Sequence, residues 1–129
     1  MNSVICKTFT ANVTIGLFRG YSEKSIPVPE FKKALLNAQK TIIAQFKIEL
    51  SAKVSPCEIL FLGQDEPAME LDFIQYPKFP QEESVLKKAI VELTKLMMLE
   101  LEQNRVVIVF SDETIMLEQS DSIDPKIQL

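Results

Sequence analysis

The chain has no histidine, and this absence excludes more chemistry than any motif in the sequence suggests. Serine, cysteine and threonine nucleophiles usually depend on an imidazole base, and metal hydrolases usually bind their metal through imidazole. Switches that act near neutral pH also rely on the imidazole pKa. The groups that remain for catalysis are carboxylates, lysine, tyrosine, arginine or a terminal amine.

Cysteine and arginine are scarce as well. Cys6 and Cys57 allow at most one disulfide, and two cysteines without histidine do not make a zinc site, so we expect no metal and interpret both as small buried apolar residues. Arg19 and Arg105 are the only arginines, and the net charge is -4. Nucleic acids and anionic membranes bind clustered lysine and arginine, so we expect neither as a partner.

Glycine and long apolar runs are also rare. Gly20 and Gly63 are isolated, so the chain has no phosphate-cradling loop, and we expect no cofactor. No apolar run approaches the roughly 18 residues that span a bilayer, and Lys7 and Asn12 interrupt any signal core near the start. These features predict a cytoplasmic protein.

What the sequence does contain is one hydrophobic layout written twice. Each copy has an extended apolar run, a long amphipathic helix and a second apolar run. The segments are 13–18, 29–50 and 57–62 in the first copy, and 69–74, 80–103 and 106–110 in the second. Each copy is short enough to be one supersecondary unit.

The two helices are predicted from apolar residues spaced by three or four positions. Pro29 and Pro80 suit the first helical position, where a missing N–H does no harm. The predicted buried faces are Phe31, Leu35, Ala38, Ile42, Phe46 and Leu50 in the first helix, and Leu86, Ala89, Ile90, Leu93, Leu96, Met97 and Leu101 in the second, with the Met97 and Met98 pair read as core filler.

The order of elements predicts an α+β fold with a βαββαβ plan, a four-stranded mixed sheet and both helices on one face. The stretch 63–67 is short enough for a hairpin, so the second and third strands should be antiparallel neighbours, and residues 114–117 read as a short return strand. We expect a single domain over 1–129, with its core in 12–117 and a loosely ordered tail over 118–129.

This plan leaves one face of the sheet without cover. In the expected edge strands, residues 59–62 and 106–110 are apolar on both faces, as in strands that are covered from both sides. Exposed edges of that kind promote aggregation. We therefore expect a homo-oligomer that buries the open face, with a trimer favoured over a dimer.

The pattern from Glu70 through the helix near Leu86 to the strand ending at Phe110 resembles the second repeat of the tautomerase superfamily, in its carboxymethyl-hydroxymuconate isomerase branch. The resemblance implies a trimer with a proton-transfer site. The catalytic N-terminal proline of that superfamily is missing, because this chain opens with Met1. A ferredoxin-like domain, which has the same order of elements, is the alternative fold.

Five residues are candidates for a site. Glu70 and Asp72 fall on the polar face of a central strand, where burial in an oligomer would suit them to proton transfer, and they are the catalytic candidates. Arg19, Lys24 and Tyr76 lie at strand ends or in the following loop and are the candidates for binding a small, anionic ligand. The same carboxylates could instead be solvated or paired with lysine.

Two functions follow from these features. The first is a small oligomeric protein that binds a ligand or partner without catalysis. The second is an isomerase or tautomerase that transfers a proton on a small anionic keto acid, as the resemblance implies. Turnover of phenylpyruvate-like acids separates the two.

Overall fold

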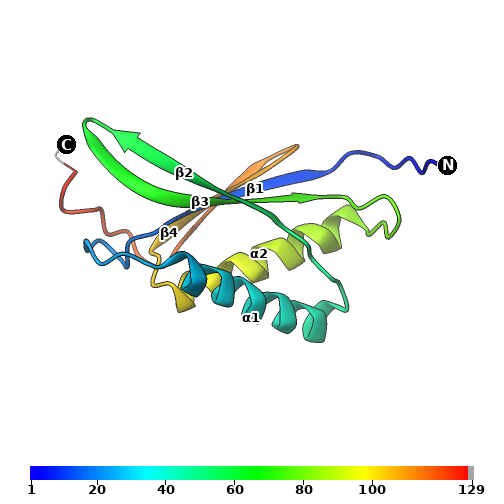
Figure 1. Cartoon of the computed structure of the whole chain (residues 1–129), viewed down its shortest axis with the longest axis horizontal. Helices are drawn as coiled ribbons and strands as arrows, with labels where there is room; N and C mark the ends of the chain where they lie inside the picture. Colours follow the sequence, from blue (N-terminus) through cyan, green and yellow to red (C-terminus); the bar gives the residue numbers. More distant parts are fainter. Residues whose placement is uncertain (128–129) are drawn as a thin grey trace.

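A computed structural model describes residues 1–127 of the chain. Two helices and an antiparallel sheet of five strands form the α+β structure, with both helices on the same face of the sheet (Figure 1). The elements are β1 (Thr10–Gly16), α1 (Val28–Phe46), β2 (Lys53–Phe61), β3 (Gln64–Ile74), α2 (Glu83–Glu100), β4 (Arg105–Phe110) and β5 (Thr114–Glu118).

The sheet corrects the prediction of four strands in a mixed arrangement. The strand order is β2-β3-β1-β4-β5, and every neighbouring pair is antiparallel. Each β-α-β unit is split, because the strand from the other unit lies between its two strands, which is the ferredoxin-like order of elements. The return strand that was expected near residues 114–117 pairs with β4, so β4 is not the edge of the sheet.

The β2–β3 hairpin confirms that these strands are antiparallel neighbours, but its turn is tighter than predicted. Leu62 and Gly63 form the turn, and both have a positive φ, 48° and 84°. Two-residue turns of this kind match the twist of the strands that they join. Residues 64–67, which were predicted as loop, consequently extend β3 and pair with β2.

Both helices are shorter than predicted. α1 ends because Lys47 adopts the left-handed conformation at the C-cap, where its N–H reaches the carbonyl of Ile43. The start of α2 is delayed to Glu83 because Gln75 holds the preceding loop, donating to the carbonyl of Gln81 and accepting from its N–H. Leu50 and Leu101 are buried beyond the helix ends, where the chain returns to the sheet.

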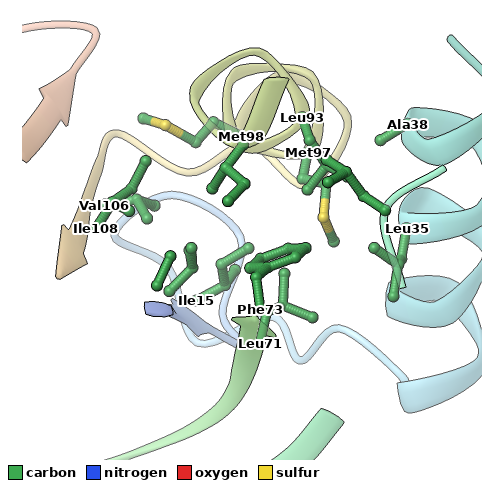
Figure 2. Close-up of a cluster of buried hydrophobic side chains, with 14 of the residues drawn as sticks. Ile15, Leu35, Ala38, Leu71, Phe73, Leu93, Met97, Met98, Val106 and Ile108 are labelled. Atoms are coloured by element: carbon green, nitrogen blue, oxygen red, sulfur yellow. The ribbon is translucent and has the colours of Figure 1, made fainter. Parts of the chain in front are cut away.

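The core lies between the sheet and the helices. Ile15, Leu71, Phe73 and Ile108 rise from the strands toward α1 and α2, and the predicted filler residues Met97 and Met98 pack among them (Figure 2). The most deeply buried side chains are Phe9, Phe31, Phe73, Ile15, Ile42, Leu71, Ile90, Leu93, Met97, Leu101, Ile108 and Val13. Burial therefore begins at Phe9, three residues before the expected core boundary.

Within residues 1–127, no helix covers the opposite face of the sheet (Figure 1). On this open face, Val107, Val109 and Met116 are 39%, 47% and 54% exposed. β4 alternates between exposed and buried residues, so it is not covered on both sides as its composition suggested. At the edge, Leu60 of β2 is exposed as well.

Two further expectations need correction or completion. Cys6 and Cys57 are free and only half-buried, because Cys57 lies on the open face of the edge strand and Cys6 in the segment before β1. The expected loose tail over 118–129 begins inside β5, and the residues that follow make hydrogen bonds described below; residues 128 and 129 lie outside the described part. No helix within residues 1–127 is long and apolar enough to cross a membrane.

Candidate functional site

A cavity of about 620 Å³ opens where β1 ends, on the open face of the sheet. Its floor contains Thr14 and Gly16, and Gly16 pairs with Ala68 of β3. The floor is low because neither Gly16 nor Ala68 carries a long side chain. The walls come from the loop after β1, the β2–β3 hairpin, the start of β4 and the chain after β5.

Glu66 of β3 supplies the carboxylate nearest to this floor. Its side chain lies over Gly16, close enough that a Cβ atom at Gly16 would collide with the carboxylate. Burial raises the pKa of Glu66, Asp124 raises it further, and Lys126 lowers it; none of these influences is a hydrogen bond from a described residue. The site therefore holds a half-buried carboxylate that has no hydrogen bond from a described residue.

The start of β4 forms a polar wall of the cavity. Arg105 donates to the Glu118 carboxylate of β5 at 2.7 Å and to the Ser122 carbonyl at 3.3 Å. The Glu118 pair raises the pKa of Arg105. Gln103 anchors the loop after β1, because its side-chain amide donates to the Phe18 carbonyl at 2.7 Å.

Two aromatic side chains border the cavity. Phe18 continues the open face beyond Gly16, and Tyr21 lies in the next loop. The Tyr21 hydroxyl donates to the Ser122 carbonyl at 2.8 Å and accepts from the Asn104 amide at 2.9 Å. Phe18, Tyr21 and Glu66 therefore line the same cavity.

The two predicted catalytic carboxylates lie farther along the same face of β3. Asp72 accepts a hydrogen bond from Asn12 of β1 at 2.8 Å, and Glu70 lies 3.5 Å from the Ser55 hydroxyl of β2. Glu70 and burial together raise the pKa of Cys57, with burial the larger cause. Neither Glu70 nor Asp72 lines the cavity, so their catalytic role stays a prediction.

The structure brings together two of the three predicted ligand-binding residues, since the Arg19 N–H donates to the Lys24 carbonyl at 3.0 Å, and leaves Tyr76 apart. Arg19 pairs with Glu30 and with Glu102, which raises its pKa, with the Glu30 hydrogen bond the largest cause. Lys24 is exposed in the same loop, and its N–H bonds the Ser22 hydroxyl. This end of the molecule contains the cavity, but Arg19 and Lys24 do not line it.

Tyr76 lies at the other end of β3. Its ring stacks on Phe79, with centroids 5.9 Å apart and an angle of 12°. Both rings line a separate, apolar cavity of about 970 Å³ beside the C-terminal half of α1. Ile74 lies eight residues after Glu66 along β3, which is about 26 Å at a strand's usual rise, so Tyr76 cannot share a small ligand with Glu66.

Glu66 was missed because residues 63–67 were interpreted as a loop. One signal in the sequence could have found it, since Glu66, Glu70 and Asp72 all occupy even positions and therefore point to one face of a strand. Extending that alternation backward from Glu70 through Ala68 places Glu66 on the same face of the sheet as Thr14 and Gly16 of β1. The two-residue turn at Leu62 and Gly63 allows β3 to begin at Gln64 and so to include Glu66.

Comparison with known proteins gives a similarity in structure alone. No protein-family model and no curated protein matches the chain. A phage SAM lyase in the apo state is similar with a TM-score of 0.69 and 12% identity, over 89% of this chain and 91% of that chain. A phage SAM lyase in complex with S-methyl-5'-thioadenosine is similar with a TM-score of 0.67 and 13% identity, over 95% and 98%. These likenesses show that the fold of this chain is shared with those structures.

Proposed function

We propose that the chain binds an S-adenosyl sulfonium compound in the cavity around Glu66 and cleaves it as a lyase. The observation that carries this proposal is the half-buried Glu66 carboxylate over Gly16, which has no hydrogen bond from a described residue. A carboxylate in that state favours a cationic ligand. The structural likeness to SAM lyases supports the choice of cation.

The chemistry of the sulfonium fits such a site. In S-adenosylmethionine the positive sulfur carries a methyl, an adenosyl and an aminocarboxypropyl group. Breaking the sulfur bond to the third group leaves the bonding electron pair on sulfur and gives neutral S-methyl-5'-thioadenosine. As the carbon–sulfur bond breaks, the four-carbon fragment either loses a proton from the adjacent carbon to form a C=C bond or closes onto its own carboxylate to form a lactone, so no water is consumed.

Each part of the cavity has a role in this proposal. Glu66 holds the sulfonium, and its raised pKa also makes it a better acceptor for a proton lost in elimination. Phe18 offers an apolar face to the adenine base. The lack of histidine is no obstacle, because neither route needs an imidazole nucleophile or a metal.

The test is conversion of S-adenosylmethionine to S-methyl-5'-thioadenosine by the purified protein, followed by chromatography. We expect product from the wild type and at least tenfold less from Glu66→Gln, since removing one partner of a buried charge pair costs about 3–5 kcal/mol and a tenfold change corresponds to about 1.4 kcal/mol. Glu58→Gln is the matched control, because Glu58 is an exposed carboxylate of β2 outside the cavity. Absence of product from the wild type contradicts the lyase.

Binding without turnover, as predicted from the sequence, is the second candidate. The observation that favours it is the Tyr21 hydroxyl, which is already engaged by Asn104 and Ser122 and so is not free to transfer a proton. Saturable binding of S-methyl-5'-thioadenosine with no product from S-adenosylmethionine would select this function. The tautomerase alternative also stays a prediction, tested by turnover of phenylpyruvate.

We also retain the proposal of a homo-oligomer, preferably a trimer. Its support is the open face, where the apolar side chains Val107, Val109 and Met116 are partly exposed in the single chain. At about 25 cal/mol per Å² of apolar surface, covering several such side chains would stabilise an assembly by a few kcal/mol. The cavity opens on this same face, so an assembled partner would border it.

A further inference from the structure

The chain after β5 runs across the mouth of the cavity. Residues 119–127, which we name the strap, follow the start of β4, pass the loop after β1 and reach the tip of the β2–β3 hairpin (Figure 1). Asp124, Lys126 and Ile127 of the strap line the cavity. The strap therefore forms one wall that belongs to no helix or strand.

The root of the strap is firmly attached. The Gln119 N–H bonds the Asn104 carbonyl at 2.8 Å, and the Gln119 side-chain amide bonds the Gln103 carbonyl at 2.7 Å. Ser120 donates its N–H and its hydroxyl to the Asn104 side-chain oxygen, each at 3.0 Å. These bonds fix where the strap leaves the sheet.

The far part of the strap is attached mainly through Lys126. Its ammonium lies 3.1 Å from the Glu23 carboxylate and 5.9 Å from the centroid of the Phe18 ring. Its carbonyl accepts a hydrogen bond from the Gln64 side chain at 2.8 Å. The glutamate is 81% exposed, so the ion pair is weak and easily broken.

The Lys126 ammonium lies where we expect a cationic nucleoside to bind. It lies over Phe18, where a base could stack, and its charge is close enough to lower the pKa of Glu66. A sulfonium ligand carries both features, a flat base and a positive charge. Lys126 and such a ligand would compete for the same surroundings.

We infer that the strap is a latch on the cavity and that Lys126 holds it closed by occupying the place of the ligand's cationic nucleoside. This inference rests on the proposed function for the identity of the ligand. The attachment of the strap through Lys126 does not depend on that identity. The latch opens by breaking the Glu23 pair and the Gln64 bond. The root stays in place through Gln119, Ser120 and the Ser122 carbonyl, which accepts hydrogen bonds from Tyr21 and Arg105.

Lys126→Gln tests the latch without any ligand. Hydrogen–deuterium exchange of peptides covering 123–127 should become about two- to fivefold faster than in the wild type, which is the most that loss of an exposed ion pair gives. Peptides covering 119–122, α2 and β4 should keep their rates, because the bonds at Gln119, Ser120 and Ser122 remain. Lys78→Gln, which changes an exposed lysine in the loop before α2, is the matched control and should leave strap exchange unchanged. Unchanged strap exchange in Lys126→Gln overturns the latch.

Ligand binding to the same variants tests the competition. Sinefungin, in which an amine replaces the sulfonium, and neutral S-methyl-5'-thioadenosine are titrated calorimetrically into the wild type and both variants. We expect Lys126→Gln to bind sinefungin severalfold more tightly, with a smaller gain for the neutral nucleoside. Wild-type binding that Lys126→Gln does not strengthen overturns the competition. If strap exchange rises but no protein binds either nucleoside, the latch stands and the proposed function fails.

Discussion

The two faces of the sheet carry opposite chemistry on the same strands. In β3, Leu71 and Phe73 are buried under the helices, whereas Glu66, Glu70 and Asp72 point to the open face. The covered face is close-packed and apolar, so it determines stability. The open face is polar, contains a hollow at Gly16 and retains exposed valines, so it is the face suited to binding.

The largest expected effect is the loss of stability when a buried side chain of the covered face is truncated. Leu71→Ala should lower the free energy of unfolding by about 2–5 kcal/mol, because it removes a fully buried side chain and leaves a cavity. Asp72→Ala, on the other face of the same strand, should lower it by about 1 kcal/mol through loss of the Asn12 hydrogen bond. Urea denaturation measures both, and equal losses would contradict the distinction between faces.

The second prediction concerns assembly through the open face. Val109→Lys should reduce the mass of the oligomer, because a charge placed in an apolar interface is strongly unfavourable. Analytical ultracentrifugation at micromolar concentration measures the mass. Ala44→Lys, at an exposed position of α1, is the control and should assemble normally. A wild type that stays a monomer at that concentration would contradict the proposal of a homo-oligomer.

The third prediction sharpens the role of the hollow. Gly16→Ala should weaken binding of sinefungin by about tenfold, equivalent to about 1.4 kcal/mol, because the added methyl group displaces the Glu66 carboxylate. The fold should survive, since Gly16 lies in a strand and the displaced atoms are the end of a flexible side chain. Calorimetry gives the affinity and circular dichroism checks the fold. Unaltered affinity would show that Glu66 does not need its position over Gly16.

The smallest expected effect is a pH dependence at Glu66. The pKa of Glu66 is raised in the folded protein. At pH values just above the ordinary pKa of a glutamate, Glu66 is therefore protonated more often in the folded state than in the unfolded state. Stability is therefore lost as the pH rises through that window. We compare the free energy of unfolding of Glu66→Gln with that of the wild type at pH 4 and at pH 7. The difference should favour the variant more at pH 7 than at pH 4. A difference between the two proteins that is the same at both values would contradict the raised pKa.

Periodicity predicted much of the covered face from the sequence. Both helices, their buried stripes and the antiparallel pairing of β2 with β3 follow from apolar spacing and a short loop. Strand order did not follow, because periodicity says which face a residue occupies and nothing about which strand lies beside it. The fifth strand was seen as a return segment but was left out of the expected sheet.

The site was predicted less well than the fold. Glu70 and Asp72 were assigned to the open face, where the structure places them, yet the cavity forms farther along β3. Its position depends on the tight turn at Leu62 and Gly63, on the small residue at Gly16 and on the strap. The turn is local and could have been predicted, but the packing of Glu66 over Gly16 and of the strap beside the β2–β3 hairpin joins distant segments, which a local pattern does not encode.

Mapping the binding of S-methyl-5'-thioadenosine by backbone NMR would test the location of the site most directly. Titration into the isotope-labelled wild type should shift the amides of Thr14, Gly16, Phe18 and Glu66 in a saturable manner. The amides around Tyr76 and Phe79, beside the other cavity, should stay unshifted. Saturable shifts confined to Tyr76 and Phe79, or no shifts at millimolar nucleoside, would contradict a binding site at Glu66.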